Sequence, residues 1–463
     1  MQKNKIIINL FVIAVIAFIV GLWGIDFGLN SRQSLSLSIF SLSILGTVFF
    51  WEFRLAFAFL GTSILLISKT IDIENLILSS SLDVILFLIG MMVLIALLKE
   101  TGLFAWIITL ILRVKNLNAK KFTLILSVVS ALLSCAVGEV ASIILMVAAI
   151  LEICDYYEVE PMSFIMISVF ATNIGSAGTV LGNPVGILIA TKAGLTFEDF
   201  IIKAFPLMVL CLVVTTILIF RIFKKDIQSL DKKMKELGAN EMLIRLISVP
   251  PEQRLKKALL IFGVELFFIS MHHRLEILLG LEPNTILIAV PLMFAAFVMI
   301  LKHESARKYI EEGVEWWTLL FFMLLFAQAG TLKYIGTTDF LAHKIAAFTG
   351  SNHNFLIGFI IWTSAIGSSV LDNVVLVAAF IPIIQSFQNI NLGPLWWALL
   401  FGGCLGGNIT VVGSTANIVA AGILEKERNV KISFLRWIGV GLLVGVVTVS
   451  VVWVCLMFLP AYQ

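Results

Sequence analysis

The chain has 463 residues, of which 60% are hydrophobic and only 13% are charged, and its mean hydropathy is +1.06. Soluble domains carry about 25% charged residues, so this composition excludes a water-soluble core and predicts an all-α polytopic membrane protein surrounded by lipid. The formal net charge is only +3 and the basic residues gather in a few loops, a pattern that gives no indication of a nucleic-acid partner.

Apolar segments long enough to cross a bilayer recur along the chain, since a spanning helix needs about 20 apolar residues. The sequence predicts about 11 crossings, at residues 6–23, 35–50, 54–71, 83–98, 161–191, 198–222, 257–271, 283–301, 315–332, 395–423 and 435–458. Two further apolar stretches, 121–154 and 354–388, are too long for one helix, and polar residues interrupt each. We expect both to be re-entrant hairpins with tips that face an internal site, because non-helical backbone at membrane depth must be covered by protein or water.

A charged linker at 223–256 separates two halves, and its lysines and arginines predict a cytoplasmic location by the positive-inside rule. Counting crossings outward from this linker predicts a cytoplasmic N-terminus and an outer C-terminus in the cell (inner) membrane. The predicted order is an extra N-terminal span at 1–34, a first repeat at 35–222, the linker, and a second repeat at 257–463.

The two halves also repeat each other in sequence. Residues 175–187 align without a gap on residues 406–418, and residues 83–102 resemble residues 315–336. Because the crossing count gives the two copies opposite orientations, we expect an inverted repeat, a construction typical of secondary transporters.

Two stretches rich in glycine, asparagine and threonine interrupt apolar spans, one in each half. Glycine weakens a helix, and unwinding would free backbone carbonyls for a cation and present half-helix N-termini to an anion. The alternative is close packing of helices through small residues, and we favour binding because both halves carry the feature at matched positions. The candidates are Thr172, Asn173, Gly175, Thr179 and Asn183 in the first half, and Gly407, Asn408, Thr410, Ser414, Thr415 and Asn417 in the second.

The predicted hairpin tips carry carboxylates. Glu139 and Ser142 lie near the first tip, and Ser369, Asp372 and Asn373 lie at the second. A carboxylate at membrane depth costs about 3 kcal/mol on insertion scales, so it is normally retained for a task. Glu139 or Asp372 could bind a cation when ionised or take up a proton, and exchange between these states would couple proton flow to transport. The alternative is a carboxylate that caps the second hairpin helix, and capping can coexist with coupling.

Other residue patterns narrow the function. The five cysteines form no Cys-x-x-Cys pair, so we expect no zinc site, disulfide framework or other cofactor. No nucleotide-binding Gly-x-x-x-x-Gly-Lys-Ser/Thr loop and no catalytic constellation of an intramembrane protease is present, so we expect no enzyme activity. Four tryptophans at predicted span ends are expected to anchor the chain at the membrane interface; they are Trp316, Trp317, Trp396 and Trp397.

On these residues the chain resembles the ion transporter superfamily, in the branch of arsenite efflux pumps, NhaD-type sodium/proton antiporters, the P protein and citrate-transporter-like proteins. The matching stretches are 315–322, 371–374, 172–184 and 406–417. The resemblance implies an elevator-type transporter that is a homodimer, with scaffold parts at 35–98 and 257–332. It implies transport parts, each a re-entrant hairpin and a broken helix, at 121–191 and 354–423.

In the family the hairpin tips and broken-helix loops hold substrate and coupling ions. That role carries over to Asp372 and Asn373, and to four candidate Na+ ligands, Asn173, Thr179, Asn408 and Thr410. One departure is that the first tip here reads Gly138-Glu139-Val140, where close relatives often carry Asp-Asn. Neither tip has the Ser-Asn-Thr motif of dicarboxylate carriers.

The sequence therefore predicts an ion-coupled secondary active transporter of a small ion, with H+ or Na+ as the coupling ion. Na+/H+ exchange and efflux of an arsenite-like inorganic anion are the leading hypotheses. A di- or tricarboxylate symporter and an ion channel of the same fold are the alternatives. A soluble ATPase partner, as arsenite systems allow, is a further open alternative.

Overall fold

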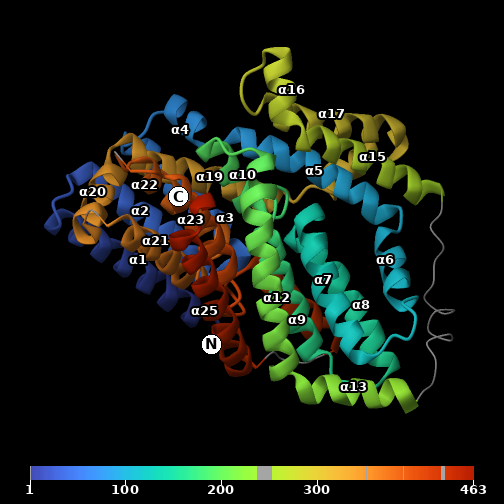
Figure 1. The fold of residues 1–463 in the computed structure, drawn as a ribbon. Helices are drawn as coiled ribbons and strands as arrows, with labels where there is room; N and C mark the ends of the chain where they lie inside the picture. Colours follow the sequence, from blue (N-terminus) through green and yellow to red (C-terminus); the bar gives the residue numbers. More distant parts are fainter. Residues whose placement is uncertain (1, 237–252, 351, 389, 429–432, 463) are drawn as a thin grey trace.

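The computed structural model describes residues 2–236, 253–350, 352–388, 390–428 and 433–462, and helices are the only regular elements within these ranges (Figure 1). Positions 237–252 of the predicted linker lie outside the described residues. The first half contains α1 (Gln2–Asp26), α2 (Ser31–Phe49), α3 (Arg54–Ile67), α4 (Ile73–Ser79), α5 (Leu82–Glu100), α6 (Leu103–Leu112), α7 (Ala119–Val137), α8 (Glu139–Tyr156), α9 (Met162–Ser176), α10 (Pro184–Ala193), α11 (Phe197–Asp199), α12 (Phe205–Ile222) and α13 (Lys224–Glu236). The second half contains α15 (Gln253–Ser270), α16 (His272–Leu279), α17 (Thr285–Leu301), α18 (Ala306–Glu311), α19 (Trp316–Tyr334), α20 (Thr337–Thr349), α21 (His353–Ser368), α22 (Asn373–Gln385), α23 (Gly393–Gly406), α24 (Thr415–Arg428) and α25 (Phe434–Phe458).

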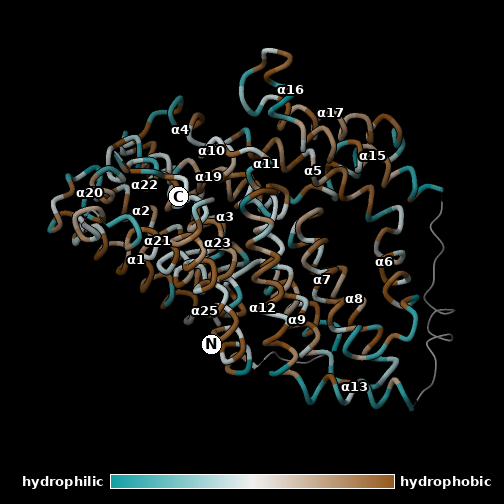
Figure 2. Tube along the Cα trace, in the orientation of Figure 1, coloured by the Kyte–Doolittle hydropathy of each residue, from teal (hydrophilic) through white to brown (hydrophobic). Residues whose placement is uncertain are grey.

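Several of these helices can cross a membrane. Six are long and apolar enough to do so, and the number rises to 8 if each of two sharply bent helix pairs is one span. Apolar residues dominate these helices, whereas α13 is largely hydrophilic (Figure 2). The chain is therefore a multi-pass membrane protein. The larger predicted number of crossings stays a prediction, because it also counts shorter helices such as α3, which has 14 residues.

Helix breaks occur at the four positions where polar residues interrupt the apolar stretches. Gly138 separates α7 from α8 with a φ of +87°, a conformation that glycine adopts without the steric cost of a Cβ. Residues 369–372 separate α21 from α22. The broken helices α9/α10 and α23/α24 are interrupted at 177–183 and 407–414. Each half thus holds one helix pair joined at a tip and one broken helix.

The two halves pack their hairpins on their broken helices in the same way. A Cβ at Gly175 would lie 2.6 Å from the Cα of Ala131, and a Cβ at Gly406 would lie 2.6 Å from the Cα of Ala365. Gly175 and Gly406 are aligned positions of the sequence repeat, so the repeat is also structural. These two glycines serve the close helix packing that the sequence left as an alternative to binding.

We expect Gly406→Ala to destabilise the protein strongly. The new methyl group would meet the backbone of Ala365, which cannot move aside as a flexible side chain could, and overpacking of this kind costs about 1–3 kcal/mol or more. Gly422→Ala is the matched control, because a Cβ there meets no atom within 4 Å. Thermal unfolding of the purified protein should show a lowered midpoint for Gly406→Ala alone. Equal midpoints for the two variants would contradict this packing argument.

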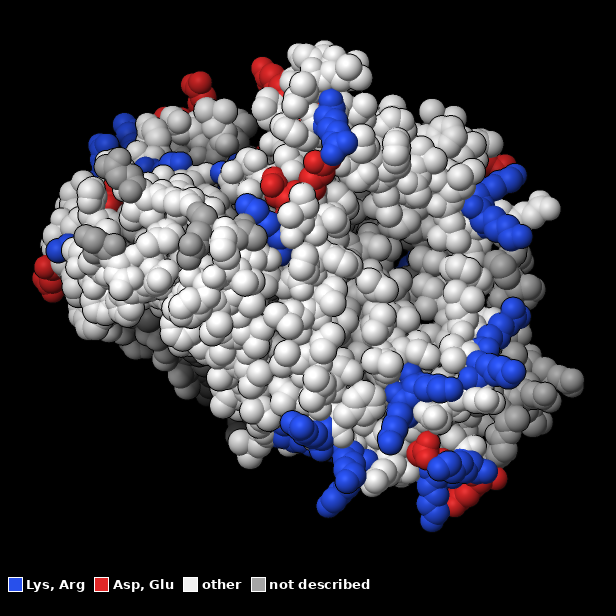
Figure 3. Space-filling model, in the orientation of Figure 1, with Lys and Arg blue, Asp and Glu red and all other residues white. Residues whose placement is uncertain are grey.

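Contacts between loops agree with the predicted grouping of loops on two sides. Arg436 at the start of α25 pairs with Asp226 and Glu160 at 3.4 and 3.5 Å, all on the predicted cytoplasmic side. Arg274 pairs with Glu198 at 2.7 Å on the predicted outer side. On the face in Figure 3, basic side chains gather along the lower edge around α13, below a broad band almost free of charge.

The predicted role of two tryptophans is wrong. Trp396 and Trp397 lie near the start of α23 and are buried, and the Trp397 ring packs edge-on against Phe200 at 5.2 Å. Their burial follows from the position of α23, which α9, α21, α22 and α25 all contact. Trp316 and Trp317 are exposed, as an interfacial role requires.

Candidate ion and solute site

The two broken helices meet through buried asparagines. The Nδ2 of Asn173 in α9 donates to the Oδ1 of Asn408 at 2.9 Å and to the Oδ1 of Asn417 at 2.8 Å. The hydroxyl of Ser414 donates to the Oδ1 of Asn173 at 3.0 Å. Asn173 thus joins residues from both halves that are more than two hundred positions apart in sequence, and four of the predicted site residues converge.

Asn417 also fixes the loop that interrupts the second broken helix. Its Nδ2 donates to the backbone carbonyls of Gly407 and Thr410 at 2.7 and 2.8 Å. These carbonyls were candidates for binding a cation once the helix unwinds. In this conformation the amide of Asn417 occupies the same acceptors.

The repeat-related positions of Ser414 and Asn173 make an equivalent contact. The Nδ2 of Asn183 donates to the hydroxyl of Ser176 at 2.8 Å and to the Sγ of Cys404 at 3.1 Å. In the aligned repeat Asn183 corresponds to Ser414 and Cys404 to Asn173. Asn183 also caps α10, since its Oδ1 accepts from the Gly186 amide at 2.8 Å, and this fixes its direction.

Glu139 is the first residue of α8 and is 4% exposed. Its backbone N–H donates to the carbonyl of Gly182 at 3.0 Å, which attaches the first hairpin tip to the first broken helix. Its Oε2 accepts from the Nδ2 of Asn373 at 3.4 Å, so the two hairpin tips meet. No ion pair joins Glu139 to any basic side chain that the structure describes.

Asp372 is the N-cap of α22 and is 3% exposed. Its Oδ1 accepts from the Val374 amide at 3.0 Å, and its Oδ2 accepts from the Thr415 hydroxyl at 2.6 Å. The capping arrangement that the sequence left open is therefore present. Capping uses one oxygen only, and within the described residues no salt bridge neutralises the charge.

The four candidate Na+ ligands do not gather at one point. Asn173 and Asn408 are in contact, but the Thr179 hydroxyl donates to the carbonyl of Cys135 at 2.5 Å in the first hairpin. The Thr410 hydroxyl donates to the carbonyl of Ser369 in the second hairpin. Each threonine attaches a broken helix to the hairpin of its own half, a contact that the repeat duplicates.

Ser142 and Thr172 do not join the asparagine network. The Ser142 hydroxyl donates to the Ser130 carbonyl at 3.1 Å within the first hairpin. The Thr172 hydroxyl is buried and has no hydrogen-bond partner among the described residues. Within the described part of the chain, no group of three or more His, Cys, Asp or Glu side chains is placed to hold a metal ion.

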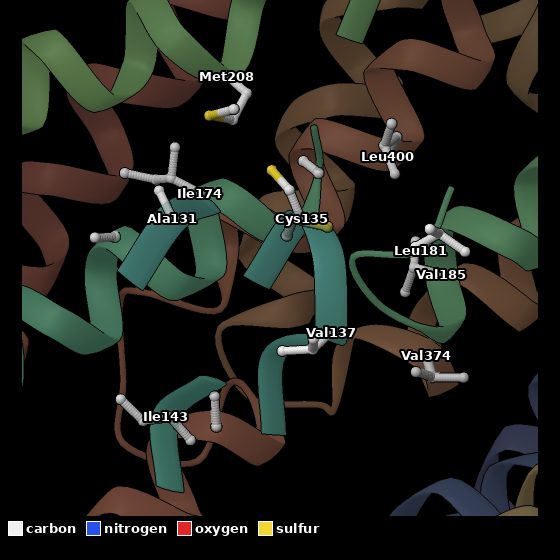
Figure 4. Close-up of a cluster of buried hydrophobic side chains, with 14 of the residues drawn as sticks. Ala131, Cys135, Val137, Ile143, Ile174, Leu181, Val185, Met208, Val374 and Leu400 are labelled. Carbon is white, nitrogen blue, oxygen red and sulfur yellow. The ribbon is translucent and has the colours of Figure 1, made fainter. Parts of the chain in front are cut away.

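A cavity of about 500 Å³ lies beside the hairpin tips. Glu139, Asn183 and Thr415 line one wall, and Glu315 and Thr318 line another with apolar residues of α5. Figure 4 shows the apolar side chains around the first tip, where Val137, Leu181, Val185 and Val374 come from separate elements. Lys99 and Lys308 also line the cavity. Its volume is within the range of small-molecule sites, which is about 300–1,000 Å³.

Sequence reasoning missed several residues of this region. Ser176 and Cys404 contact Asn183, and Glu315 and Thr318 line the cavity. The polar stretch around Ser176 and the repeat-matched position of Cys404 were available signals. Glu315 and Thr318 lie in the family-like stretch 315–322, but nothing in that stretch marked them as site residues, and only the packing of α19 brings them to the cavity.

A second pocket, of about 390 Å³, lies near the other ends of α5 and α19. The Nζ of Lys333 in α19 donates to the Oε1 of Gln385 in α22 at 2.7 Å, and Gln385 donates to the carbonyl of Lys192 at 3.0 Å. Lys192 pairs with Asp83 of α5 at 3.9 Å. These contacts join α5 and α19 to α10 and α22 at this end.

The chain is similar to several known proteins. It is 31% identical over 376 residues to an uncharacterized transporter of Mycobacterium tuberculosis, covering 80% of this chain and 84% of the relative. It is 25% identical to the human P protein over 80% of this chain, a match that spans only 52% of that longer protein. The crystal structure of the YdaH transporter of Alcanivorax borkumensis has a similar fold, with a TM-score of 0.51, 14% identity, and coverage of 83% and 87% of the two chains.

A family model described as "Citrate transporter" matches residues 5–402, which is most of both halves. The predicted resemblance to the branch with the P protein is confirmed by these relatives. The chain belongs to the citrate transporter (CitMHS) family of membrane transporters.

Proposed function

We propose that this transporter is an ion-coupled secondary active transporter in which Glu139 and Asp372 carry the coupling ion, H+ or Na+. The observation that supports the proposal most directly is the burial of two carboxylates at helix breaks without a salt bridge to a described residue. A buried ionised carboxylate is costly unless a cation or proton neutralises it. Each carboxylate comes from a different half, and the cavity lies beside them.

In this proposal α7–α10 and α21–α24 form a transport unit that moves against a scaffold of α2–α5 and α15–α19 in a homodimer. The cavity wall supports this division, because its two sides come from the two groups of helices. The basic segment with Lys302, Arg307 and Lys308 lies at the end of the cavity that Lys99 and Lys308 line. By the positive-inside rule that end is cytoplasmic, so the present conformation is inward-facing in the inner membrane. The N-terminus is then cytoplasmic and the C-terminus outside.

The cargo in this proposal is a small ion, moved by Na+/H+ exchange or as an arsenite-like inorganic anion. An organic carboxylate is the second candidate, supported by the description of the matching family. The cavity is large enough for such an anion, and Lys99 and Lys308 could pair with its charges. One observation argues against an organic carboxylate: neither hairpin tip carries the Ser-Asn-Thr motif of dicarboxylate carriers.

A flux screen tests the proposal and names the cargo. The purified chain is placed in proteoliposomes with an interior pH dye, and Na+, Li+, K+, arsenite, chloride or citrate is added in turn. We expect one of these ions to move protons at a rate that saturates with its concentration. Proton movement that does not saturate would indicate a channel instead, and no proton movement with any ion would contradict H+ coupling.

A further inference from the structure

Helix α13 is amphipathic and begins where a membrane span ends. It follows α12 after one residue, and α12 belongs to the candidate span Phe197–Ile222. In Figure 1 it runs below the lower ends of α7 and α12, and it contacts both helices. Ile227, Leu230 and Met234 recur at helical spacing and are buried, so the protein already covers the apolar face of α13. The opposite face is exposed.

Two of the three acidic side chains of α13 are held against the rest of the protein. Asp226 accepts from the Ser163 hydroxyl at 2.5 Å and pairs with Arg436 at 3.4 Å, which joins α13 to α9 and α25. Asp231 accepts from the Ala119 amide at 3.4 Å, which joins α13 to the start of α7. These two carboxylates therefore serve contacts within the protein, and little negative charge is left on the exposed face.

Lysines are in surplus on the exposed face of α13. Lys224 and Lys225 are exposed, and neither makes an ion pair with any residue that the structure describes. Lys232 and Lys235 pair with carboxylates of α13 itself, but their side chains are 79% and 76% exposed. Pairs this exposed contribute little. The face therefore presents accessible ammonium groups to its surroundings.

The turn before α7 extends this charge. It adds four exposed basic side chains, Arg113, Lys115, Lys120 and Lys121. The contact between Ala119 and Asp231 places this turn against α13, and a candidate membrane span begins at Ala119. The basic surface formed by this turn and the lysines of α13 thus marks one membrane boundary, where one span ends and another begins. Basic side chains gather at this lower edge in Figure 3.

We propose that this basic surface binds the headgroups of anionic phospholipids in the adjoining leaflet. A cluster of about four to eight lysines and arginines directly after a membrane span, on an amphipathic helix, is the pattern that recognises an anionic lipid surface. Lys224 follows the end of its span at Ile222 by two residues, which places its ammonium group at the depth of the headgroups. The inference is independent of the proposed coupling, because it involves neither Glu139 nor Asp372.

The test measures contact between α13 and lipids of known charge. Ser229 is exposed and lies one helical turn from both Lys225 and Lys232, so a fluorophore on Ser229→Cys reports on the basic surface. The labelled full chain is placed in phosphatidylcholine nanodiscs. A quenching lipid with a nitroxide on its acyl chain near the headgroup is then added, either phosphatidylglycerol or phosphatidylcholine. The native cysteines are buried except Cys455, which is half-buried, and the chain without Ser229→Cys gives the background.

We expect quenching at a lower fraction of phosphatidylglycerol than of phosphatidylcholine, and high salt should reduce this difference because it screens exposed charges. The double variant Lys224→Gln/Lys225→Gln should raise the phosphatidylglycerol fraction for half-maximal quenching by about fivefold or more, since one basic residue near an anionic surface contributes about a fivefold attraction. Lys69→Gln/Lys344→Gln is the matched control. It removes the same charge at two exposed positions outside the basic surface and should keep the parent value.

Three results would overturn the proposal. Equal quenching by the two lipids in the parent chain would show that headgroup charge is not recognised. Quenching by neither lipid would show that α13 faces water, where an acidic soluble partner would fit the surface instead. An unchanged lipid preference in Lys224→Gln/Lys225→Gln would assign the preference to residues other than these two lysines. The measurement needs no transported ion, so a flux screen without a coupled ion would count against the proposed function only.

Discussion

Asp372→Asn should abolish proton movement driven by the transported ion while leaving the protein folded. Asparagine is as good an N-cap as aspartate, so the bond from the Val374 amide to this position can persist. The Thr415 hydroxyl loses a charged acceptor, but a hydroxyl can rotate to accept from the new amide. The substitution therefore removes the charge with little change in shape. Proteoliposomes with an interior pH dye should show the signal of empty liposomes.

Asp72→Asn is the matched control for this prediction. Asp72 is also an N-cap, with its Oδ1 accepting from the Asn75 amide at 2.8 Å, but it lies in an exposed loop before α4. The same chemical change at the same kind of cap should leave the flux at the parent level. Parent-like flux from a folded Asp372→Asn protein would show that Asp372 only caps α22, and the coupling role would then be withdrawn.

Glu139→Gln should have a different and equally large effect, which is to separate cargo movement from proton movement. Glutamine resembles protonated glutamate in size and charge, so the transport unit would always be in its neutral form at this position. The contact with Asn373 can be retained through the amide oxygen. We expect exchange of labelled cargo across the membrane to continue, while the accompanying proton signal disappears.

Two measurements on the same proteoliposomes check this expectation, one of cargo exchange and one of interior pH. Glu152→Gln is the control, because Glu152 lies on the same helix and is exposed. If proton movement persists in Glu139→Gln, the proton is carried elsewhere and Glu139 has a structural role at the tip. If cargo exchange stops as well, Glu139 contacts the cargo itself.

The long apolar helices and the four helix breaks of this fold could be predicted because each has a local cause. Long apolar stretches specify helices in lipid, and a glycine or polar interruption marks where a helix ends, as at Gly138. The gapless match of residues 175–187 with 406–418 indicated which positions correspond. The family resemblance grouped Asn173 with Asn408 as candidate ion ligands, and the structure joins these two side chains by a hydrogen bond.

The contacts across the two halves could not be predicted, because they depend on how distant helices pack. The four candidate Na+ ligands were grouped by residue type, yet Thr179 and Thr410 point to separate hairpins. The sequence wrongly predicted Trp396 at the membrane interface, because its position resembles the end of a span. Only the packing of the surrounding helices buries it.

The offset between the two hairpin tips has a consequence for how such a protein can arise. Counted from the matched Ala131 and Ala365, Glu139 corresponds to Asn373 and Gly138 to Asp372. Two identical half-length subunits facing each other could supply only two identical acids, related by symmetry. Fusion of the halves into one gene allows each tip to change alone, so one acid can specialise for a proton and its neighbour for another ion. Divergence after gene duplication thus allows two different acidic residues at two nearly symmetric positions.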